Sequence, residues 1–416
     1  MRPGRSGAGR ALGIYLTLLV AVAVALVLAP LATAAPAKGP EGIEARAWIV
    51  VDARSGDVLA SQAAQRRLPI ASTTKLMTAY VAMKELGPEK VVRAAPYEPI
   101  YGESLMGLQA GERVSVRDLL YGLMLVSGND AAHTLAVAAA GSEARFVEEM
   151  NRYAAALGLA DTHYANSIGL DQRGNYSTAA DLSTLARRLL RIPAFAKIAD
   201  TRSVLLRSLR PPRRIDNSND LLGMVPWASG VKTGHTFDAG YVLVASGERD
   251  GVSLVSATLG GPSEESRFLE NLELLEYGFS QYQRRLPIRA GQDLAEPEIR
   301  YSGGNLPLRA ERSLQVGVRR DQRLDLRVRA PEEVEGPIRR GARLGRATVF
   351  VDGRKVGTVP LRASRAVAEA GFFDRARATV DDNLIPIGIA LFVIVIIGVI
   401  LLRRLARRDD FRSRIG

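Results

Sequence analysis

Hydrophobic positions change their spacing several times along the chain, and each spacing predicts a different element. Short apolar runs predict two strands joined by a turn, at 47–51 and 58–61. A helical period begins at Ser72 and continues to about 85. Further helices are predicted at 116–126, 130–139, 142–157 and 178–190, then strands at 230–236, 240–247 and 252–260, and a helix at 264–282. Strands at both ends with helices between them predict an α+β domain whose sheet is assembled from distant segments.

The pattern changes after Pro287, where glycine, proline and charged residues divide short apolar runs. These runs are typical of short strands and lie at 314–318, 324–328, 347–351 and 355–360. Asp352-Gly353, between the last two, is a strong hairpin signal. We therefore predict a second, all-β domain at 288–363, followed by a short amphipathic linker at 364–383.

Two longer apolar runs mark the ends of the chain. Three arginines precede the first run, which ends in Ala32-Thr33-Ala34. This order predicts a signal peptide at 1–34, with an uncleaved anchor as the alternative. The uncharged run at 384–402 reaches about 28 Å as a helix, close to the thickness of the hydrocarbon core, and predicts a transmembrane helix. The tail at 403–416 has six arginines and two aspartates. The positive-inside rule makes it cytoplasmic, so 35–383 is expected on the extracytoplasmic, periplasmic side of the cell membrane.

Charge and composition exclude several classes of protein. The net charge of +12 suggests a nucleic-acid partner at first. The two ends carry +3 and +4 of it, however, so we expect no nucleic acid. The absence of cysteine excludes disulfide scaffolds and thiolate chemistry, and three histidines without an H-E-x-x-H motif argue against a metal. With seven lysines against 49 arginines, any lysine that chemistry requires stands out.

Ser72 and Lys75 stand three residues apart at the predicted start of the first long helix. Three residues are nearly one turn, so the hydroxyl and the amine share a face. A neutral lysine is able to activate a serine, provided that burial and a second cation lower its pKa. A helix N-terminus adds N–H groups for a developing oxyanion. By itself, the pattern is also that of a capped surface helix.

Two further motifs follow in a characteristic order. Ser127-Gly128-Asn129 lies between predicted helices, where it suits a proton relay and a peptide-binding amide, although an ordinary capped turn uses the same residues. Lys232-Thr233-Gly234 lies on a predicted strand and suits a substrate carboxylate and a closely approaching peptide. Penicillin-binding proteins and class A β-lactamases carry this set, with Ser-Asp-Asn as its middle element; here Gly128 replaces the aspartate.

The chain resembles the low-molecular-mass penicillin-binding proteins that act as serine-type D-alanyl-D-alanine carboxypeptidases. The resemblance spans about 42–375 and includes Ser104-Leu105-Met106, Gly169-Leu170-Asp171 and Ala239-Gly240-Tyr241. It implies a catalytic domain at 42–284, with an antiparallel sheet and a helical cluster, and a small β-domain. It also implies peptidoglycan stem peptides ending in D-Ala-D-Ala as substrates, β-lactam antibiotics as covalent inhibitors, and no metal or organic cofactor.

The resemblance assigns roles to eight residues. Ser72 would be the nucleophile, Lys75 the proton acceptor and Ser127 the proton relay. The implied substrate-binding residues are Asn129, Lys232, Thr233, Gly234 and His235. The backbone N–H groups of Ser72 and His235 would form the oxyanion hole. His133 and His163 are expected to be structural or exposed, and Asp171 suits a supporting loop or a simple turn equally.

Some features depart from the family pattern or leave alternatives. Asn217-Ser218-Asn219 has serine where relatives often have arginine, which makes Arg213 and Arg214 candidates for binding the terminal carboxylate. Many relatives attach through an amphipathic surface helix, whereas 384–402 looks like a true span. A D,D-endopeptidase shares the same motifs. A weak β-lactamase is a further alternative, although the chain has no Glu-x-x-Leu-Asn motif. A non-catalytic wall-binding protein is another, but such a protein would be expected to lack part of the motif set, and here all three motifs are intact.

Overall fold

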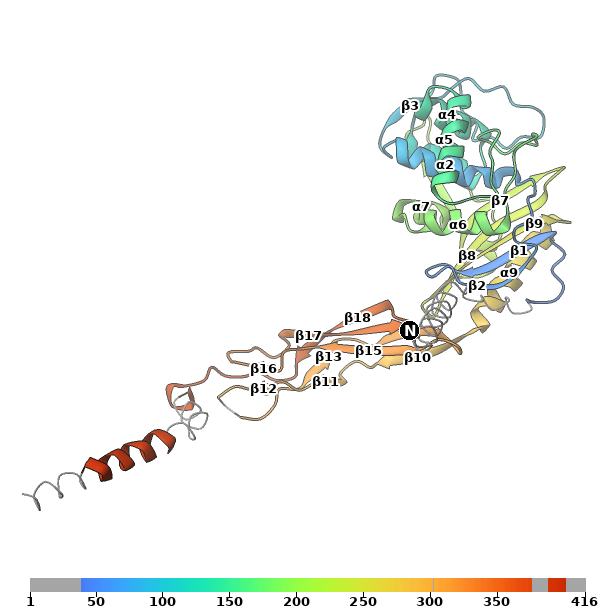
Figure 1. Cartoon of the computed structure of the whole chain (residues 1–416). Coiled ribbons are helices and arrows are strands. Elements are labelled where there is room, and N and C mark those ends of the chain that lie inside the picture. Colours follow the sequence, from blue (N-terminus) through green and yellow to red (C-terminus); the bar gives the residue numbers. More distant parts are fainter. Residues whose placement is uncertain (1–38, 302, 376–387, 402–416) are drawn as a thin grey trace, which may run out of the picture.

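A computed structural model describes residues 39–301, 303–375 and 388–401 of the chain (Figure 1). The predicted signal peptide at 1–34 and tail at 403–416 lie outside these residues, as do 376–383 of the linker and the ends of the predicted span. Residues 388–401 are helical, and most of their large apolar side chains are exposed. Within the described ranges, no helix has both the length and the apolar character needed to cross a membrane.

A five-stranded antiparallel sheet forms the middle of the first domain, in the order β2-β1-β9-β8-β7. Its strands are β1 (Ala47–Asp52), β2 (Val58–Gln62), β7 (Ala228–Thr236), β8 (Gly240–Arg249) and β9 (Val252–Gly261). β1 pairs with β9, so that Ala47 lies opposite Leu259. The prediction of an α+β domain with a sheet built from distant segments is confirmed.

Helices cover both faces of this sheet (Figure 1). The 3-10 turn η1 (Ala71–Thr74) and six helices lie on one side: α2 (Lys75–Glu85), α3 (Val116–Leu125), α4 (Asn129–Ala140), α5 (Glu143–Ala156), α6 (Ala179–Leu190) and α7 (Pro193–Ala199). The long helix α9 (Glu264–Ser280) covers the other side. The short α8 (Leu221–Met224) precedes β7.

Strand β1 shows how one sequence pattern serves two cores. Ala47, Ile49 and Val51 are buried in the cluster beneath the helices, while Trp48 and Val50 are buried in the cluster beneath α9. Successive side chains of a strand point to opposite faces, so a strand covered on both sides is apolar throughout.

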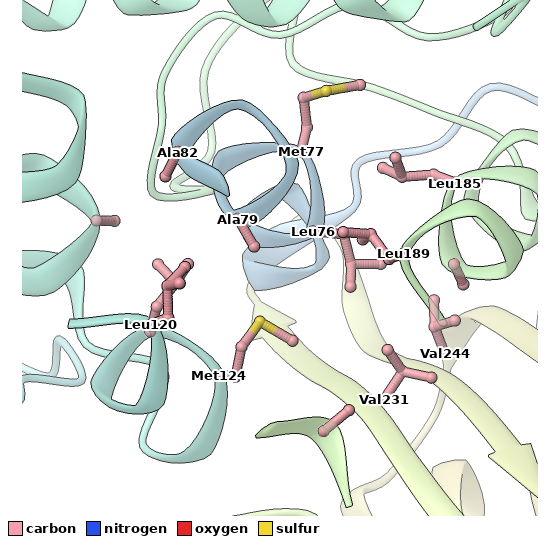
Figure 2. Packing of buried hydrophobic residues seen from close by; sticks show 14 of the residues in the cluster. Leu76, Met77, Ala79, Ala82, Leu120, Met124, Leu185, Leu189, Val231 and Val244 are labelled. Atoms are coloured by element: carbon pink, nitrogen blue, oxygen red, sulfur yellow. The ribbon is translucent and has the colours of Figure 1, made fainter. Parts of the chain in front are cut away.

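The larger core fixes the helix that follows Ser72. Leu76 of α2, Leu189 of α6 and Val244 of β8 are all fully buried in it. Figure 2 shows Leu76 pointing toward Leu189, with Val231 and Val244 of the sheet nearby. Because α2 is packed on several sides, the residues at its start have little freedom to move.

The second domain is built from strands, as predicted. They are β10 (Tyr282–Ile288), β11 (Asp293–Ala295), β12 (Glu298–Ile299), β13 (Leu308–Ala310), β14 (Leu314–Arg319), β15 (Leu324–Arg329), β16 (Glu333–Val334), β17 (Arg343–Val351) and β18 (Arg354–Ala363). β17 and β18 are longer than the short runs at 347–351 and 355–360 suggested. Asp352 and Gly353 both have positive φ and join β17 to β18, which confirms the predicted hairpin. β10 pairs with β14, so the strands of this domain begin at Tyr282.

The structure differs from the predicted elements where segments are short. The helix predicted to open at Ser72 begins instead with the 3-10 turn η1. Two small antiparallel strand pairs were not predicted: β3 (Val91–Arg93) with β4 (Arg113–Ser115), and β5 (Ser203–Leu206) with β6 (Arg213–Asp216). Strands of three or four residues are too short to display a period, and tertiary contacts decide whether they form.

Candidate active site

The predicted nucleophile and its base lie at the junction of η1 and α2. Lys75 is fully buried, and its Nζ donates to Ser72 Oγ over 3.0 Å. The same amine donates to Asn129 Oδ1 at 2.6 Å and to the carbonyl of Ile168 at 2.5 Å. An ammonium group has three donors, so these acceptors complete its hydrogen bonding. Lys75 is therefore in direct contact with both Ser72 and Asn129.

Two buried lysines shape the electrostatics of the site. Burial holds the pKa of Lys75 well below its ordinary value, and the charge of Lys232 lowers it further. Burial, and after it the charge of Arg267, lowers the pKa of Lys232 to about 7. Both shifts come first from desolvation, which disfavours a charged amine in an apolar interior. The lowered pKa of Lys75 favours its neutral form, which is the form able to accept a proton.

Ser127 occupies the turn between α3 and α4 in a strained conformation. Its φ of +60° lies in the left-handed region that non-glycine residues rarely adopt. Its hydroxyl is buried and has no hydrogen-bond partner within the described residues. A Cβ on the neighbouring Gly128 would lie 2.9 Å from both Asp130 Oδ1 and the nitrogen of Met106. This crowding explains why glycine stands where the Ser-Asp-Asn pattern has aspartate.

Asn129 is held by a carboxylate that the sequence motifs did not reveal. Its Nδ2 donates to Glu103 Oε2 at 2.8 Å, and the hydroxyl of Tyr97 donates to the same oxygen. Glu103 lies on the loop between β3 and β4, where no helical or strand spacing relates it to Asn129. The available signal was its position next to Ser104-Leu105-Met106, a segment already included in the resemblance.

Asp130 anchors the loop that carries Glu103. Its carboxylate accepts three 2.8 Å hydrogen bonds from the backbone nitrogens of Met106, Gly107 and Leu108. The nitrogen of Asn129 also donates to the carbonyl of Ser104 at 2.8 Å. Segment 104–108 is thus tied to the start of α4, next to the Ser-Gly-Asn motif.

Strand β7 brings the Lys-Thr-Gly motif alongside η1. A Cβ on Gly234 would lie 3.1 Å from the nitrogen of Ser72, so glycine permits this close approach. Lys232 and Thr233 are buried, and Lys232 Nζ donates to the carbonyl of Thr233 at 3.0 Å. The exposed ring of His235 stacks on Tyr241, with 4.1 Å between the ring centroids. Because β7 is the last strand of the sheet, its outer backbone groups remain open to an extended peptide.

The residues considered for the terminal carboxylate differ in their surroundings. Ser218 Oγ lies 3.4 Å from Thr233 Oγ1. Arg213 forms a 3.0 Å ion pair with Glu112, so its charge is already compensated. Arg214 is exposed on β6, and no ion pair of its side chain is seen within the described residues.

Asp171 and two of the histidines have structural contacts. Asp171 Oδ1 accepts from Thr236 Oγ1 at 2.6 Å, which ties its loop to the end of β7. His133 Nδ1 lies 2.8 Å from Glu143 Oε2, and this hydrogen bond lowers the pKa of Glu143 to about 2 in spite of its burial. His163 Nδ1 lies 2.6 Å from a backbone carbonyl. Across the part of the chain that the structure describes, no three acidic or histidine side chains gather in a way that could hold a metal ion.

Comparison with known proteins places both domains in families. The family model of D-alanyl-D-alanine carboxypeptidase matches residues 32–263, and that of the C-terminal domain of penicillin-binding protein 5 matches residues 282–369. D-alanyl-D-alanine carboxypeptidase DacC of Escherichia coli K12 is 33% identical over 354 residues, which cover 80% of this chain and 86% of the relative. DacF of Bacillus subtilis 168 is 28% identical over 349 residues, which cover 82% of this chain and 90% of the relative.

Solved structures agree with this assignment. Penicillin-binding protein 5 of Haemophilus influenzae matches 79% of this chain and 99% of its own, with 28% identity and a TM-score of 0.56. The D-alanyl-D-alanine carboxypeptidase of Mycobacterium tuberculosis H37Rv matches 59% of this chain and 96% of its own, with 36% identity and a TM-score of 0.55. Membership of such a family implies D-Ala-D-Ala peptides as substrates and the binding of β-lactams. The chain belongs to the serine-type D-alanyl-D-alanine carboxypeptidases of the low-molecular-mass penicillin-binding protein family.

Proposed function

We propose that Ser72 attacks the carbonyl carbon of the terminal D-Ala-D-Ala bond while Lys75 accepts its proton. The observation that carries this proposal is the 3.0 Å hydrogen bond between Lys75 Nζ and Ser72 Oγ. A neutral Lys75 keeps two donors for Asn129 Oδ1 and the carbonyl of Ile168, which leaves its lone pair facing Ser72 Oγ. The new bond joins Ser72 Oγ to the acyl carbon, and the broken bond releases D-alanine.

Ser127 is the proposed relay between Lys75 and the leaving amine. Its buried hydroxyl, which lacks a partner within the described residues, is available to give a proton to the amine and to receive one from Lys75. Water then attacks the acyl carbon, with Lys75 and Ser127 again transferring protons. This step releases the shortened peptide as a carboxylic acid and restores the Ser72 hydroxyl. The N–H groups of Ser72 and His235 would stabilise the oxyanion of both tetrahedral intermediates.

The stem peptide is proposed to bind along the open edge of β7. Gly234 leaves space for its backbone, and Asn129 would donate to a peptide carbonyl. Lys232 and Thr233 would bind the terminal carboxylate, whose charge favours the protonated form of Lys232. Ser218, with its hydroxyl 3.4 Å from that of Thr233, adds a neutral donor at the position where relatives often have arginine.

The catalytic domain is proposed to work outside the cytoplasm, on a chain held in the cell membrane by 384–402. The apolar runs at both ends and the basic tail support this location, as do the exposed apolar side chains along 388–401. Removing 384–416 should move the protein from the membrane fraction to the soluble fraction. Continued sedimentation with membranes would contradict this attachment.

Release of D-alanine from a pentapeptide stem tests the catalytic roles. Ser72→Ala should abolish release, and mass spectrometry of the wild type should find a penicillin adduct on Ser72. Ser280→Ala, which removes a serine hydroxyl at the end of α9, is the matched control. It should keep both D-alanine release and the penicillin adduct on Ser72. A crosslinked peptide assayed in parallel measures endopeptidase activity. An adduct on another residue, or full release by Ser72→Ala, would overturn the assignment.

A further inference from the structure

The loop between β3 and β4 places a carboxylate against the proposed proton acceptor. Glu103 Oε2 accepts from Asn129 Nδ2 at 2.8 Å, and Glu103 Oε1 accepts from the nitrogen of Ile100 at 3.1 Å. Asn129 Oδ1 accepts in turn from Lys75 Nζ at 2.6 Å. A continuous chain of hydrogen bonds therefore runs from a loop carboxylate through an amide to the buried amine.

This chain decides which way the amide of Asn129 points. An ionised carboxylate only accepts, and Lys75 donates to Asn129 in both its charged and its neutral form, so the Nδ2 end must face Glu103 and the Oδ1 end must face Lys75. The reversed amide would bring two donors together at one end and two acceptors at the other. Burial opposes the charge of Glu103, but hydrogen bonds from Asn129 and Tyr97 outweigh it and lower the pKa of Glu103. Its carboxylate thus remains an acceptor at neutral pH.

We propose that Glu103 is a positioning residue, which orients Asn129 so that Oδ1 holds Lys75 beside Ser72 while the second Nδ2 hydrogen stays available to a substrate carbonyl. This inference rests on the proposed roles of Lys75 and Asn129. It assigns a function to a loop residue that lies outside all three motifs.

The charge of Glu103 has a second effect, on the titration of Lys75. Among the charged groups around Lys75, Lys232 lowers its pKa, whereas Glu103 and Asp130 raise it. On its other side, Glu103 faces Tyr97, whose pKa is raised by burial and by this contact, so its hydroxyl remains a donor.

Beyond Tyr97 lies the hydrogen-bonded pair of His133 and Glu143. The ring of Tyr97 lies 5.5 Å from that of His133, which in turn contacts Glu143. Neither residue contacts Glu103 directly, so replacing Glu103 by glutamine changes the charge next to Asn129 and leaves this pair in place. Removal of the Glu103 charge should therefore lower the pKa of Lys75.

Glu103→Gln tests both effects with little change in size. We expect D-alanine release to slow roughly tenfold in kcat, because the amide loses its charged partner, and the acidic limb of the pH–rate profile to move to lower pH. Glu98→Gln, an exposed charge change on the same loop, should leave both unchanged. Glu103→Asp keeps the charge, so the acidic limb of its pH–rate profile should stay at the wild-type pH even if D-alanine release slows.

The outcomes separate this inference from the proposed function. If penicillin acylates Ser72 in the wild type, and Glu103→Gln keeps the wild-type rate and pH profile, the role of Glu103 is overturned while the nucleophile stands. If wild-type Ser72 is not acylated, the proposed function itself fails. Thermal unfolding of each variant shows whether slower D-alanine release reflects loss of the folded state. If Glu103→Gln fails to fold, the pH–rate profile of Glu103→Asp decides whether the charge of Glu103 matters.

A second, independent observation concerns charge on the β-domain. Between 282 and 363 the chain holds 17 arginines and one lysine against ten acidic residues, a net charge of +8. Five of these arginines line one groove beside β10 and β14: Arg284, Arg285, Arg289, Arg319 and Arg320. Within the described residues, no acidic side chain lines it. Such a concentration of one charge attracts an anionic partner.

Three of the groove arginines keep their charge available. Arg319 pairs with Asp57 at 3.1 Å, and Arg284 lies 3.8 Å from Asp250. For Arg285, Arg289 and Arg320, no ion pair is seen in the described ranges, and all three side chains are exposed. The groove therefore presents uncompensated guanidinium groups, which are suited to bind carboxylates in a bidentate manner.

The position of the groove identifies its partner. Arg319 contacts the catalytic domain through Asp57, so the groove lies at the end of the β-domain near that domain. The helix at 388–401 extends from the opposite end (Figure 1). A bilayer around that helix would be remote from the groove, whereas under the proposed function the polymer on which the enzyme acts would surround the catalytic domain. We infer that the groove binds carboxylates of peptidoglycan strands next to the strand being cut.

Sedimentation of the detergent-solubilised full chain with lipid-free peptidoglycan sacculi tests this second inference. The triple variant R285Q/R289Q/R320Q should reduce binding at low salt roughly tenfold, while D-alanine release from a soluble pentapeptide stays unchanged. The control R339Q/R340Q/R343Q makes the same charge change on exposed residues elsewhere in the same domain and should bind as the wild type does.

Three results would overturn the proposed binding of peptidoglycan by the groove. Binding of the triple variant to sacculi at the wild-type level would show that the groove takes no part in binding. An equal loss in the control would show that net charge alone acts. A loss of binding to phosphatidylglycerol vesicles, with sacculus binding intact, would assign the groove to lipid.

Discussion

Gly128 marks a place where one added carbon should disturb the whole site. A Cβ there would lie 2.9 Å from Asp130 Oδ1, 2.9 Å from the nitrogen of Met106 and 3.0 Å from Met106 Cβ. Its φ of −57° is open to any residue. Gly128→Ala therefore tests steric crowding, free of the backbone strain that accompanies most glycine substitutions.

The expected cost follows from the groups that must move. Relief requires segment 104–108 or Asp130 to shift, which stretches the 2.8 Å hydrogen bonds from Met106, Gly107 and Leu108 to the Asp130 carboxylate. Overpacking of this kind costs about 1–3 kcal/mol. The same shift displaces Asn129, whose nitrogen donates to Ser104 in that segment, so acylation should slow by roughly tenfold or more, in proportion to the energy lost.

Urea unfolding and the rate of acylation by a fluorescent penicillin measure the two effects. Gly223→Ala, in α8, is the matched control, since a Cβ at Gly223 meets nothing within 4 Å. It should change neither the free energy of unfolding nor the acylation rate by a comparable amount. If Gly128→Ala unfolds at the wild-type urea concentration and is acylated at the wild-type rate, the argument from crowding is refuted.

Further predictions concern the charges of the site and one helix cap. Asp130→Asn should lower the free energy of unfolding by about 1–3 kcal/mol in urea, because backbone N–H groups lose a charged acceptor; an unchanged midpoint would contradict this. Lys232→Gln removes a cation that lowers the pKa of Lys75, so the acidic limb of penicillin acylation should move to higher pH. The pKa of Glu143 is about 2 when folded, below its unfolded value, so its contribution to stability is present above about pH 5 and lost as pH falls toward 2. Glu143→Gln should make the melting temperature depend less on pH across that window. A melting temperature that falls with pH as steeply as in the wild type would exclude this contribution of Glu143. Ser263→Ala removes the capping box of α9 and should cost about 1 kcal/mol by thermal unfolding.

The difference between predicted and observed elements follows the length of each segment. Long periodic segments such as α6 and β9 were predicted near their observed positions, because repeated burial of one face leaves a clear period. The small antiparallel pairs of β3 with β4 and of β5 with β6 were not predicted. Their residues form strands through contacts with α3 and α4, and such contacts leave no signal in three or four residues.

The sequence by itself determined the chemistry of the motifs and the order of the domains. Ser72 and Lys75 are three residues apart, so a single turn of chain suffices to bring their side chains together, as the 3.0 Å hydrogen bond shows. Asp352-Gly353 likewise sets its hairpin through backbone conformations that few residue pairs adopt. Both are local effects, and local geometry can be read from residue order.

Only the tertiary structure decided what surrounds these motifs. The low pKa of Lys75 requires burial by the helical cluster and the charge of Lys232 from a distant strand. The contact of Asn129 with Glu103 and the missing space at Gly128 depend on a loop folded against the start of α4. Desolvation, charge coupling and close packing act through space between segments far apart in the chain, and the spacing of residues along a sequence does not contain them.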